Sequence, residues 1–160
     1  MKIVFITTGG TIDKIYFDAK GGYEVGDPQV IDILSEANVM FEYEVHNLFR
    51  KDSLELTDAD RKAIRAAVDE ESCERIIVTH GTDTMVQTAL ALVDCPGKTI
   101  VLTGSLAPAR FKTSDAEFNL GMAIAAVQTL RHGVYITMNG RVFEATKVRK
   151  NREANRFESL

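Results

Sequence analysis

Four short apolar runs, separated by segments with helical patterns, constrain the fold of this chain most strongly. They occupy residues 2–6, 75–79, 99–103 and 134–138, and each is rich in Ile and Val. Nearly continuous apolar runs are typical of parallel strands covered on both faces, because a strand with one face in water alternates apolar and polar residues. Residues 41–48 (FEYEVHNL) do alternate in this way, which predicts a strand nearer an edge of the sheet.

Helical patterns lie between the runs. Thr57 with Asp60 resembles a capping box at the start of a helix that continues to about residue 70. Ser114 with Glu117 predicts a second capping box, opening a helix to about residue 130. Two further helices are predicted over residues 28–37 and 84–93.

The order of these elements defines the fold class. Strands that alternate with helices indicate βαβ units and a parallel sheet. Asn139-Gly140 is a strong signal for a two-residue hairpin, so the last strand is expected to run antiparallel. We therefore predict an α/β fold: an open, doubly wound, mostly parallel sheet with helices on both faces and a C-terminal β-hairpin. No repeat or linker divides residues 1–160, which we interpret as one domain.

Composition excludes several classes of function. Nineteen basic and 23 acidic residues give a formal net charge of −4, which provides no long-range attraction to nucleic acid or to anionic membranes. The apolar block near the N-terminus is too short for a signal peptide or a membrane span, so we expect a cytoplasmic protein. Cys73 and Cys95 suit neither a metal cluster nor a disulfide framework, and we expect both to be buried free thiols.

Hydroxyl-bearing residues gather where three of the predicted strands end. The segments are Thr7 to Thr11 (TTGGT), Thr79 to Thr84 (THGTDT) and Thr103 to Ser105 (TGS). In open α/β sheets, ligands bind at the carboxyl ends of the strands. The glycines permit a close approach of a ligand to the backbone, and residues 82–84 are expected in the first turn of a helix. One such turn alone is more often structural, but two of them favour a binding or catalytic site. The spacing of Gly9 and Gly10 does not fit the known phosphate-binding motifs.

The first two of these segments, with the residues around them, resemble motifs of a known family. Residues 4–13 (VFITTGGTID) and 77–84 (IVTHGTDT) resemble the two signature motifs of the bacterial-type L-asparaginase family. The resemblance continues through Gly104-Ser105 and residues 118–120 to the C-terminal VRKNREANRF. It covers the N-terminal domain of the usual family member, which implies a short, single-domain relative.

The resemblance implies a catalytic assignment. The family hydrolyses the side-chain amide of asparagine, and often of glutamine, through an acyl-threonine intermediate without metal or cofactor. Thr11 matches the nucleophile, and Tyr23 matches a lid tyrosine that hydrogen-bonds to it. Thr82, Asp83 and Lys150 match a second triad.

The resemblance also implies how substrate is held. Ser53 falls where family members bind the α-carboxylate of the substrate, with Asp52 beside it. Gly10, Gly81 and Asp83 complete the implied substrate site. The implied partners are asparagine, with glutamine as an alternative, and further copies of the chain in a homo-oligomer of two or more subunits.

Two features of this site follow from physical reasoning. Residues 12–26 carry few strand or helix signals, and we interpret them as a mobile lid, with an ordinary surface loop as the alternative. The negative charge of Asp83 favours the protonated form of Lys150, which opposes its use as a base. We therefore predict that the substrate ammonium pairs with Asp83 and so makes Lys150 competent.

Other functions remain as alternatives to an L-asparaginase. The same motifs occur in glutaminases and in amidotransferase subunits that supply ammonia to a partner. A non-catalytic module that binds an amino acid is a third hypothesis, although every implied catalytic side chain is present. We interpret His46, His80 and His132 as structural, because they are scattered along the sequence.

Overall fold

The computed structural model describes residues 1–160, apart from the side chain of Lys20. Its main feature is a six-stranded sheet in the order β4-β1-β5-β6-β7-β8. Neighbouring strands are parallel except for β8, which pairs antiparallel with β7. In the order of the sheet the strands are β4 (Glu42–Lys51), β1 (Lys2–Gly9), β5 (Arg75–Thr79), β6 (Thr99–Thr103), β7 (Gly133–Met138) and β8 (Arg141–Glu144).

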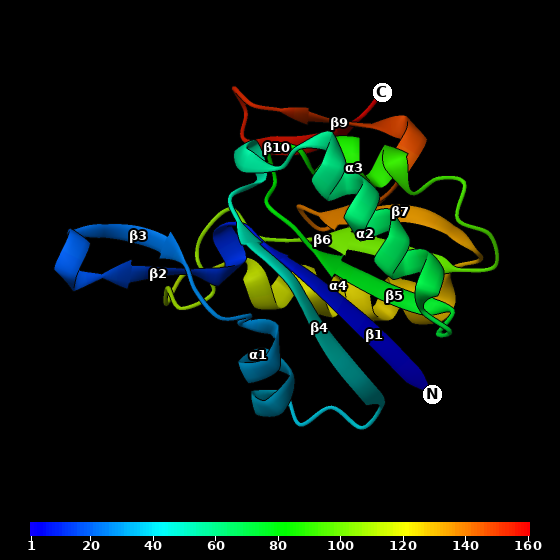
Figure 1. Ribbon diagram of the computed structural model, residues 1–160, viewed down its shortest axis with the longest axis horizontal. Coiled ribbons are helices and arrows are strands. Elements are labelled where there is room, and N and C mark those ends of the chain that lie inside the picture. The colour runs from blue at the N-terminus through cyan, green and yellow to red at the C-terminus, as the bar shows by residue number, and fades with distance from the viewer.

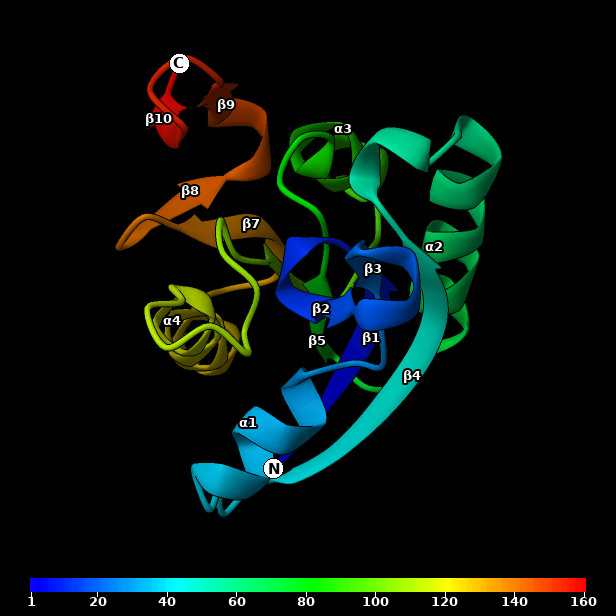
Figure 2. The same ribbon diagram turned by 90° about the vertical axis from the view of Figure 1, so that its left-hand side faces the viewer.

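Helices cover both faces of this sheet, as Figures 1 and 2 show. One apolar cluster joins the sheet to α2 (Asp58–Glu70) and α3 (Met85–Ala91), and a second joins it to α1 (Val30–Glu36) and α4 (Ala116–Thr129). Alternate residues of β1 enter the two clusters, because successive side chains of a strand point to opposite faces. The predicted doubly wound, mostly parallel α/β fold is therefore confirmed.

Two local predictions are confirmed in detail. Thr57 is the N-cap of α2, and its side chain and that of Asp60 form a reciprocal capping box. Asn139 and Gly140 have φ values of 55° and 73°, as a two-residue hairpin with both central residues left-handed requires. β8 consequently returns antiparallel along β7, with Arg141 opposite Met138.

Two predictions about helix starts are wrong. The Ser114 and Glu117 capping box does not form, and α4 begins at Ala116 after Asp115, whose carboxylate instead accepts hydrogen bonds from the backbone of Leu106 and Ala107. Thr82 to Thr84 do not occupy a first helical turn either. They form a turn before α3, which begins at Met85.

Residues 12–26, expected to have few strand or helix signals, contain an antiparallel hairpin of β2 (Lys14–Phe17) and β3 (Gly22–Val25). Figure 1 shows it projecting from the body of the molecule beyond the carboxyl end of β1. A second antiparallel pair, β9 (Val148–Asn151) and β10 (Arg156–Ser159), follows the sheet and was also not predicted. Short 3-10 helices η1 to η4 occupy Thr11–Asp13, Asp18–Lys20, Ser53–Glu55 and Ala145–Lys147.

The remaining expectations concern thiols and membranes. Both cysteines are free, and Cys95 is buried as expected, whereas Cys73 is only partly buried. Cys73 lies just before β5, and its thiol donates to the backbone carbonyls of Lys2 and Arg75. Among the helices of the described residues, none combines the length and the apolar character needed to cross a bilayer.

Candidate active site

The two motifs with threonine and glycine meet at the carboxyl ends of β1 and β5. Gly10 has a φ of 90°, and a Cβ added to it would lie 2.4 Å from the backbone nitrogen of Gly81. Only a glycine at this position allows the two backbones to approach so closely. The side chain of Thr8 also donates to the carbonyl of Thr79 at 2.9 Å. The two bends are therefore in direct contact.

A third segment, after β4, joins them. A Cβ on Gly81 would lie 2.6 Å from the hydroxyl oxygen of Ser53, so the buried Ser53 packs directly on the second motif. The Thr84 hydroxyl donates to the backbone carbonyl of Ser53 at 2.7 Å. The backbone amide of Gly10 donates to the carbonyl of Lys51 at 2.9 Å. These contacts bring Gly10, Gly81 and Ser53 together at one place.

Thr11 follows Gly10 as the first residue of η1 and is partly exposed. No hydrogen bond from a described residue holds its side-chain hydroxyl. A threonine beside a tight glycine turn, accessible and without a protein partner, is free to meet a ligand. This environment suits a nucleophile, whose oxygen must reach an external carbonyl carbon.

Lys150 lies between Thr82 and Asp83. Its ammonium donates to the Thr82 hydroxyl at 2.7 Å and to the Asp83 carboxylate at 2.6 Å. The Lys150 side chain is 9% exposed and that of Asp83 is 35% exposed. The predicted juxtaposition of these three residues is therefore present, and the Asp83 carboxylate faces partly toward solvent.

The C-terminal strand pair positions Lys150. Lys150 lies on β9 opposite Phe157 of β10. Phe157 and Val148 are buried in the apolar cluster beneath α2 and α3, and the backbone of Phe157 donates to the side chain of Asn139 at 2.8 Å. Anchoring β9 and β10 to the core in this way fixes the backbone that carries the lysine.

Asp52 is engaged by the base of the hairpin. Its carboxylate caps η3 by accepting from the Leu54 backbone, and its second oxygen lies 2.8 Å from the Lys14 ammonium at the start of β2. Lys14 was not singled out in the sequence, and only the pairing of β2 with β3 brings it near the site. A substrate group that contacts Asp52 has to share this carboxylate with Lys14.

Tyr23 is held by aromatic contacts on the hairpin. It lies on β3 opposite Tyr16, its side chain is 55% exposed, and its ring packs edge to face against Tyr16 and Phe111 with centroids 5.5 and 5.8 Å apart. Within the described part of the chain, no hydrogen bond joins Tyr23 to Thr11. The segments that carry the other predicted site residues are thus in contact, whereas Tyr23 is held by the aromatic contacts of the hairpin.

Each of the two motifs contains one buried titratable group. Asp13 accepts from the Gln29 backbone at 2.8 Å, and burial raises the pKa of this carboxyl from 3.8 to about 7. Burial lowers the pKa of His80 to about 4. The neutral His80 ring donates from Nδ1 to the Gly81 carbonyl and accepts at Nε2 from Thr88. Nothing in the sequence indicated that Asp13 would be buried.

The fold and these contacts define an α/β protein with a site made of threonine hydroxyls, a lysine and a carboxylate at the carboxyl ends of parallel strands. The family model for the N-terminal domain of asparaginases matches residues 2–159. The chain belongs to this family.

Individual relatives agree with this assignment. The chain is 31% identical over 174 residues to an L-asparaginase of Thermococcus kodakarensis, covering 100% of this chain and 51% of the relative. The solved structure of the thermostable L-asparaginase from T. kodakarensis superposes with a TM-score of 0.85, at 28% identity over 100% of this chain and 51% of that one. A glutaminase-asparaginase of Pseudomonas aeruginosa is 30% identical (92% and 45% covered). One component of a glutamyl-tRNA(Gln) amidotransferase of Methanococcus maripaludis is 29% identical (99% and 42%). The chain thus spans about half the length of the curated relatives it matches.

Proposed function

We propose that this protein hydrolyses the side-chain amide of L-asparagine to L-aspartate and ammonia. The observation that carries the proposal is the meeting of the two motifs, with Gly10 against Gly81 and Lys150 2.7 Å from the Thr82 hydroxyl. Membership of the asparaginase family supports the reaction class. No cofactor enters the proposal, since acyl transfer to a hydroxyl needs neither electrons nor a carrier.

The first half of the reaction is assigned to Thr11. Its oxygen attacks the carbonyl carbon of the substrate carboxamide and gives up its proton, and the tetrahedral intermediate collapses as the C–N bond breaks. Ammonia leaves with the transferred proton, and the aspartyl group remains as an ester on Thr11. The accessible hydroxyl beside the Gly10 turn supports this role.

The second half is assigned to Thr82 and Lys150. Water attacks the ester carbon, the bond to the Thr11 oxygen breaks, and aspartate is released as Thr11 recovers its proton. Lys150 has to lose a proton before it can accept one from water through the Thr82 hydroxyl. In the structure, the Asp83 carboxylate holds the Lys150 side chain in an ion pair at 2.6 Å.

Substrate binding resolves this conflict. We assign the substrate ammonium to the partly exposed Asp83 carboxylate and the α-carboxylate to Ser53, with Asp52 beside it and Gly10 and Gly81 lining the site. An ammonium placed on Asp83 weakens the hold of that carboxylate on Lys150 and favours the neutral amine. The deprotonation of Lys150 is thereby coupled to the presence of substrate.

The hairpin of β2 and β3 supplies the lid. Tyr23 packs on Tyr16 and Phe111 in this structure, and the proposed closed state turns its hydroxyl toward Thr11. Closure also excludes water, which strengthens electrostatic interactions within the site. To reach the closed state, Tyr23 has to give up its contacts with Tyr16 and Phe111.

Two relatives favour related activities as alternatives. The P. aeruginosa relative is a glutaminase-asparaginase, and glutamine differs from asparagine by one methylene. The M. maripaludis relative belongs to an amidotransferase, which favours ammonia supply to a partner protein. A non-catalytic amino-acid-binding module is the remaining alternative.

One assay separates these functions. Ammonia release is measured from asparagine and from glutamine with the full chain and with Thr11→Val, which removes the hydroxyl and keeps the shape. We expect turnover of asparagine that Thr11→Val lowers roughly a thousandfold or more. Preference for glutamine supports a glutaminase, activity only with an added partner supports an amidotransferase component, and saturable binding without ammonia supports a binding module.

The proposal extends to one-domain organisation, assembly and location. We propose that residues 1–160 act as one domain, in a cytoplasmic homo-oligomer of two or more chains, because the site and its lid face solvent and a neighbouring copy would help to enclose substrate. Sedimentation velocity of the full chain and cell fractionation test these points.

A further inference from the structure

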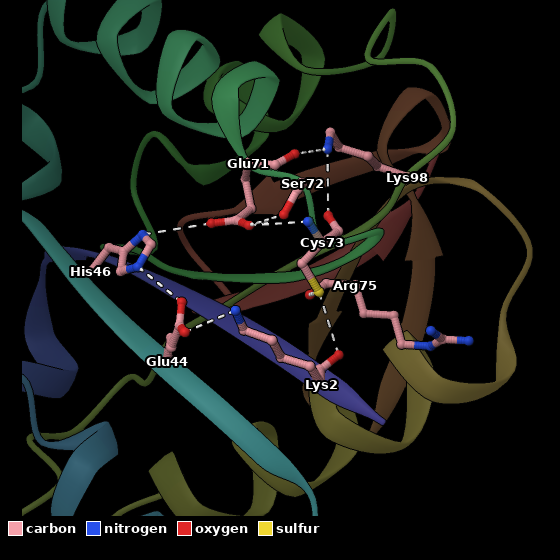
Figure 3. Close-up of polar contacts among 8 residues, drawn as sticks. All are labelled: Lys2, Glu44, His46, Glu71, Ser72, Cys73, Arg75 and Lys98. Atoms are coloured by element: carbon pink, nitrogen blue, oxygen red, sulfur yellow. Dashed lines mark hydrogen bonds and ion pairs between the residues drawn. The ribbon is translucent and has the colours of Figure 1, made fainter.

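A second group of titratable side chains lies away from the proposed active site, along the amino-terminal half of β4. Figure 3 shows Glu44, His46 and Glu71 pointing toward one another. Glu44 and His46 are two residues apart on β4, so their side chains leave the same face of the strand. Glu71 comes from a different segment, as the C-cap residue directly after α2.

The ligand-type atoms of these residues are close together. One nitrogen of His46 lies 3.6 Å from a Glu44 oxygen, and the other lies 3.8 Å from a Glu71 oxygen. One ligand atom from each residue can be chosen so that all three lie within 4.8 Å of one another. Ligands on a tetrahedral Zn²⁺ are about 3.3 Å apart. The two nitrogens of His46 face different carboxylates, and one ion can use only one of these nitrogens. Glu71 is 11% exposed, so the Glu44 and His46 side chains, each 52% exposed, have to rotate to bring one nitrogen and both carboxylates onto the ion.

The two carboxylates are already oriented by other groups. Lys2 lies 2.8 Å from Oε1 of Glu44, and the Cys73 backbone donates to Oε1 of Glu71 at 3.0 Å. The second oxygen, Oε2, of each carboxylate is the one that faces His46. Such outer partners are typical of metal sites, where they fix the orientation of the ligands.

We propose that Glu44, His46 and Glu71 bind one divalent transition metal ion, with Zn²⁺ the best match and water in the remaining position. An imidazole with two carboxylates suits Zn²⁺ better than Mg²⁺ or Ca²⁺, which prefer oxygen ligands. The Cys73 thiol is not a ligand, since it donates to two backbone carbonyls. The ion would join the edge strand β4 to the end of α2 and so stabilise the fold independently of the proposed activity.

The test is calorimetric titration of the chelator-treated full chain with zinc chloride at pH 7.5. We expect one ion per chain, with affinity at least tenfold weaker in His46→Gln and in Glu71→Gln. His132→Gln is the matched control, because His132 is similarly exposed but, among the described side chains, pairs with a single carboxylate, that of Glu74 at 3.8 Å. His132→Gln and Cys73→Ser are expected to bind as the wild type does.

Three results would overturn the proposal. They are the lack of saturable binding below about 1 mM zinc, equal binding by the wild type and His46→Gln, and loss of binding in Cys73→Ser, which would place the metal on the thiol. Circular dichroism of each variant establishes that it is folded. A zinc-dependent rise in the unfolding temperature, present in the wild type and lost in His46→Gln, provides a second readout of the same site.

Discussion

Gly10 and Gly81 lie back to back, so that a Cβ on Gly10 would fall 2.4 Å from the nitrogen and 2.5 Å from the Cα of Gly81. Residues 71 positions apart in the chain thus share the space of one side chain. The contact is between two backbones, so no side-chain movement can relieve a collision there. The distance between the Thr11 and Thr82 segments depends on this contact.

Gly10→Ala is expected to lower the free energy of unfolding by about 2 kcal/mol or more, since it combines a left-handed φ with a backbone clash. Gly21→Ala is the matched control, because Gly21 has a φ of 61° but no atom within 4 Å of an added Cβ. Its cost is expected to be about 1 kcal/mol, from the backbone conformation alone. Urea unfolding of both variants measures the difference, and equal losses would mean that the two backbones are not tightly packed.

Asp83→Asn is expected to raise the KM for asparagine ten- to a hundredfold, because a charged contact with the substrate ammonium contributes about 1.5–3 kcal/mol. Steady-state kinetics measure the change, and Asp58→Asn is the control. Asp58 also pairs with a cation, Arg61, but it is almost fully exposed and has no part in the proposed site. Unchanged activity in Asp83→Asn would remove this residue from substrate binding and from the control of Lys150.

Tyr23→Phe keeps the aromatic contacts with Tyr16 and Phe111 and removes only the hydroxyl. If that hydroxyl assists proton transfer at Thr11 in the closed state, kcat falls roughly a hundredfold or more. Tyr16→Phe removes a similarly exposed hydroxyl from the facing strand and is expected to leave kcat within about twofold. If kcat is the same in both variants, the Tyr23 hydroxyl takes no part in proton transfer at Thr11.

Asp13 is expected to make stability fall as pH rises. Burial raises the pKa of its carboxyl from 3.8 to about 7, so between these values the folded state binds more protons than the unfolded state. Asp13→Asn removes this effect. The free energy of unfolding of the variant, relative to that of the wild type, is therefore expected to rise by up to about 4 kcal/mol between pH 4 and pH 8.

The comparison of Asp13→Asn with the wild type isolates this group. His80, with a pKa lowered to about 4 by burial, has the opposite sign and costs stability as pH falls below about 6.5. It is present in both proteins, and its contribution cancels. Urea unfolding at several pH values checks the prediction, and a difference that does not change with pH would contradict it.

The parallel core was predictable because its strands are short, apolar and almost continuous. The limits of β5 and β6 agree with those predicted, 75–79 and 99–103. The hairpin of β2 and β3 was missed because none of its eight strand residues is fully buried, three of them are exposed, and its stability depends on cross-strand pairs such as Tyr16 with Tyr23. Its turn contains Asp18 and Gly21, which is the signal that would have located it.

The site was predictable from its motifs but not from its distances. The resemblance assigned Lys150 beside Thr82 and Asp83, and the structure places them in contact. The link between Lys14 and Asp52 depends on tertiary packing between segments 38 residues apart, which no local pattern contains. The cluster of Glu44, His46 and Glu71 was missed for the same reason, since only tertiary packing brings Glu71, which follows α2, against the two residues of β4.

The most direct measurement of the central claim is acid quenching of the full chain during turnover of asparagine, followed by mass spectrometry of its peptides. We expect an aspartyl ester on the peptide that contains Thr11, and no ester in Thr11→Val. The ester is expected to accumulate in Lys150→Met, which still acylates but deacylates slowly. Rapid ammonia release with no adduct on Thr11, or an adduct on Thr82 alone, would contradict the assignment of Thr11 as the nucleophile.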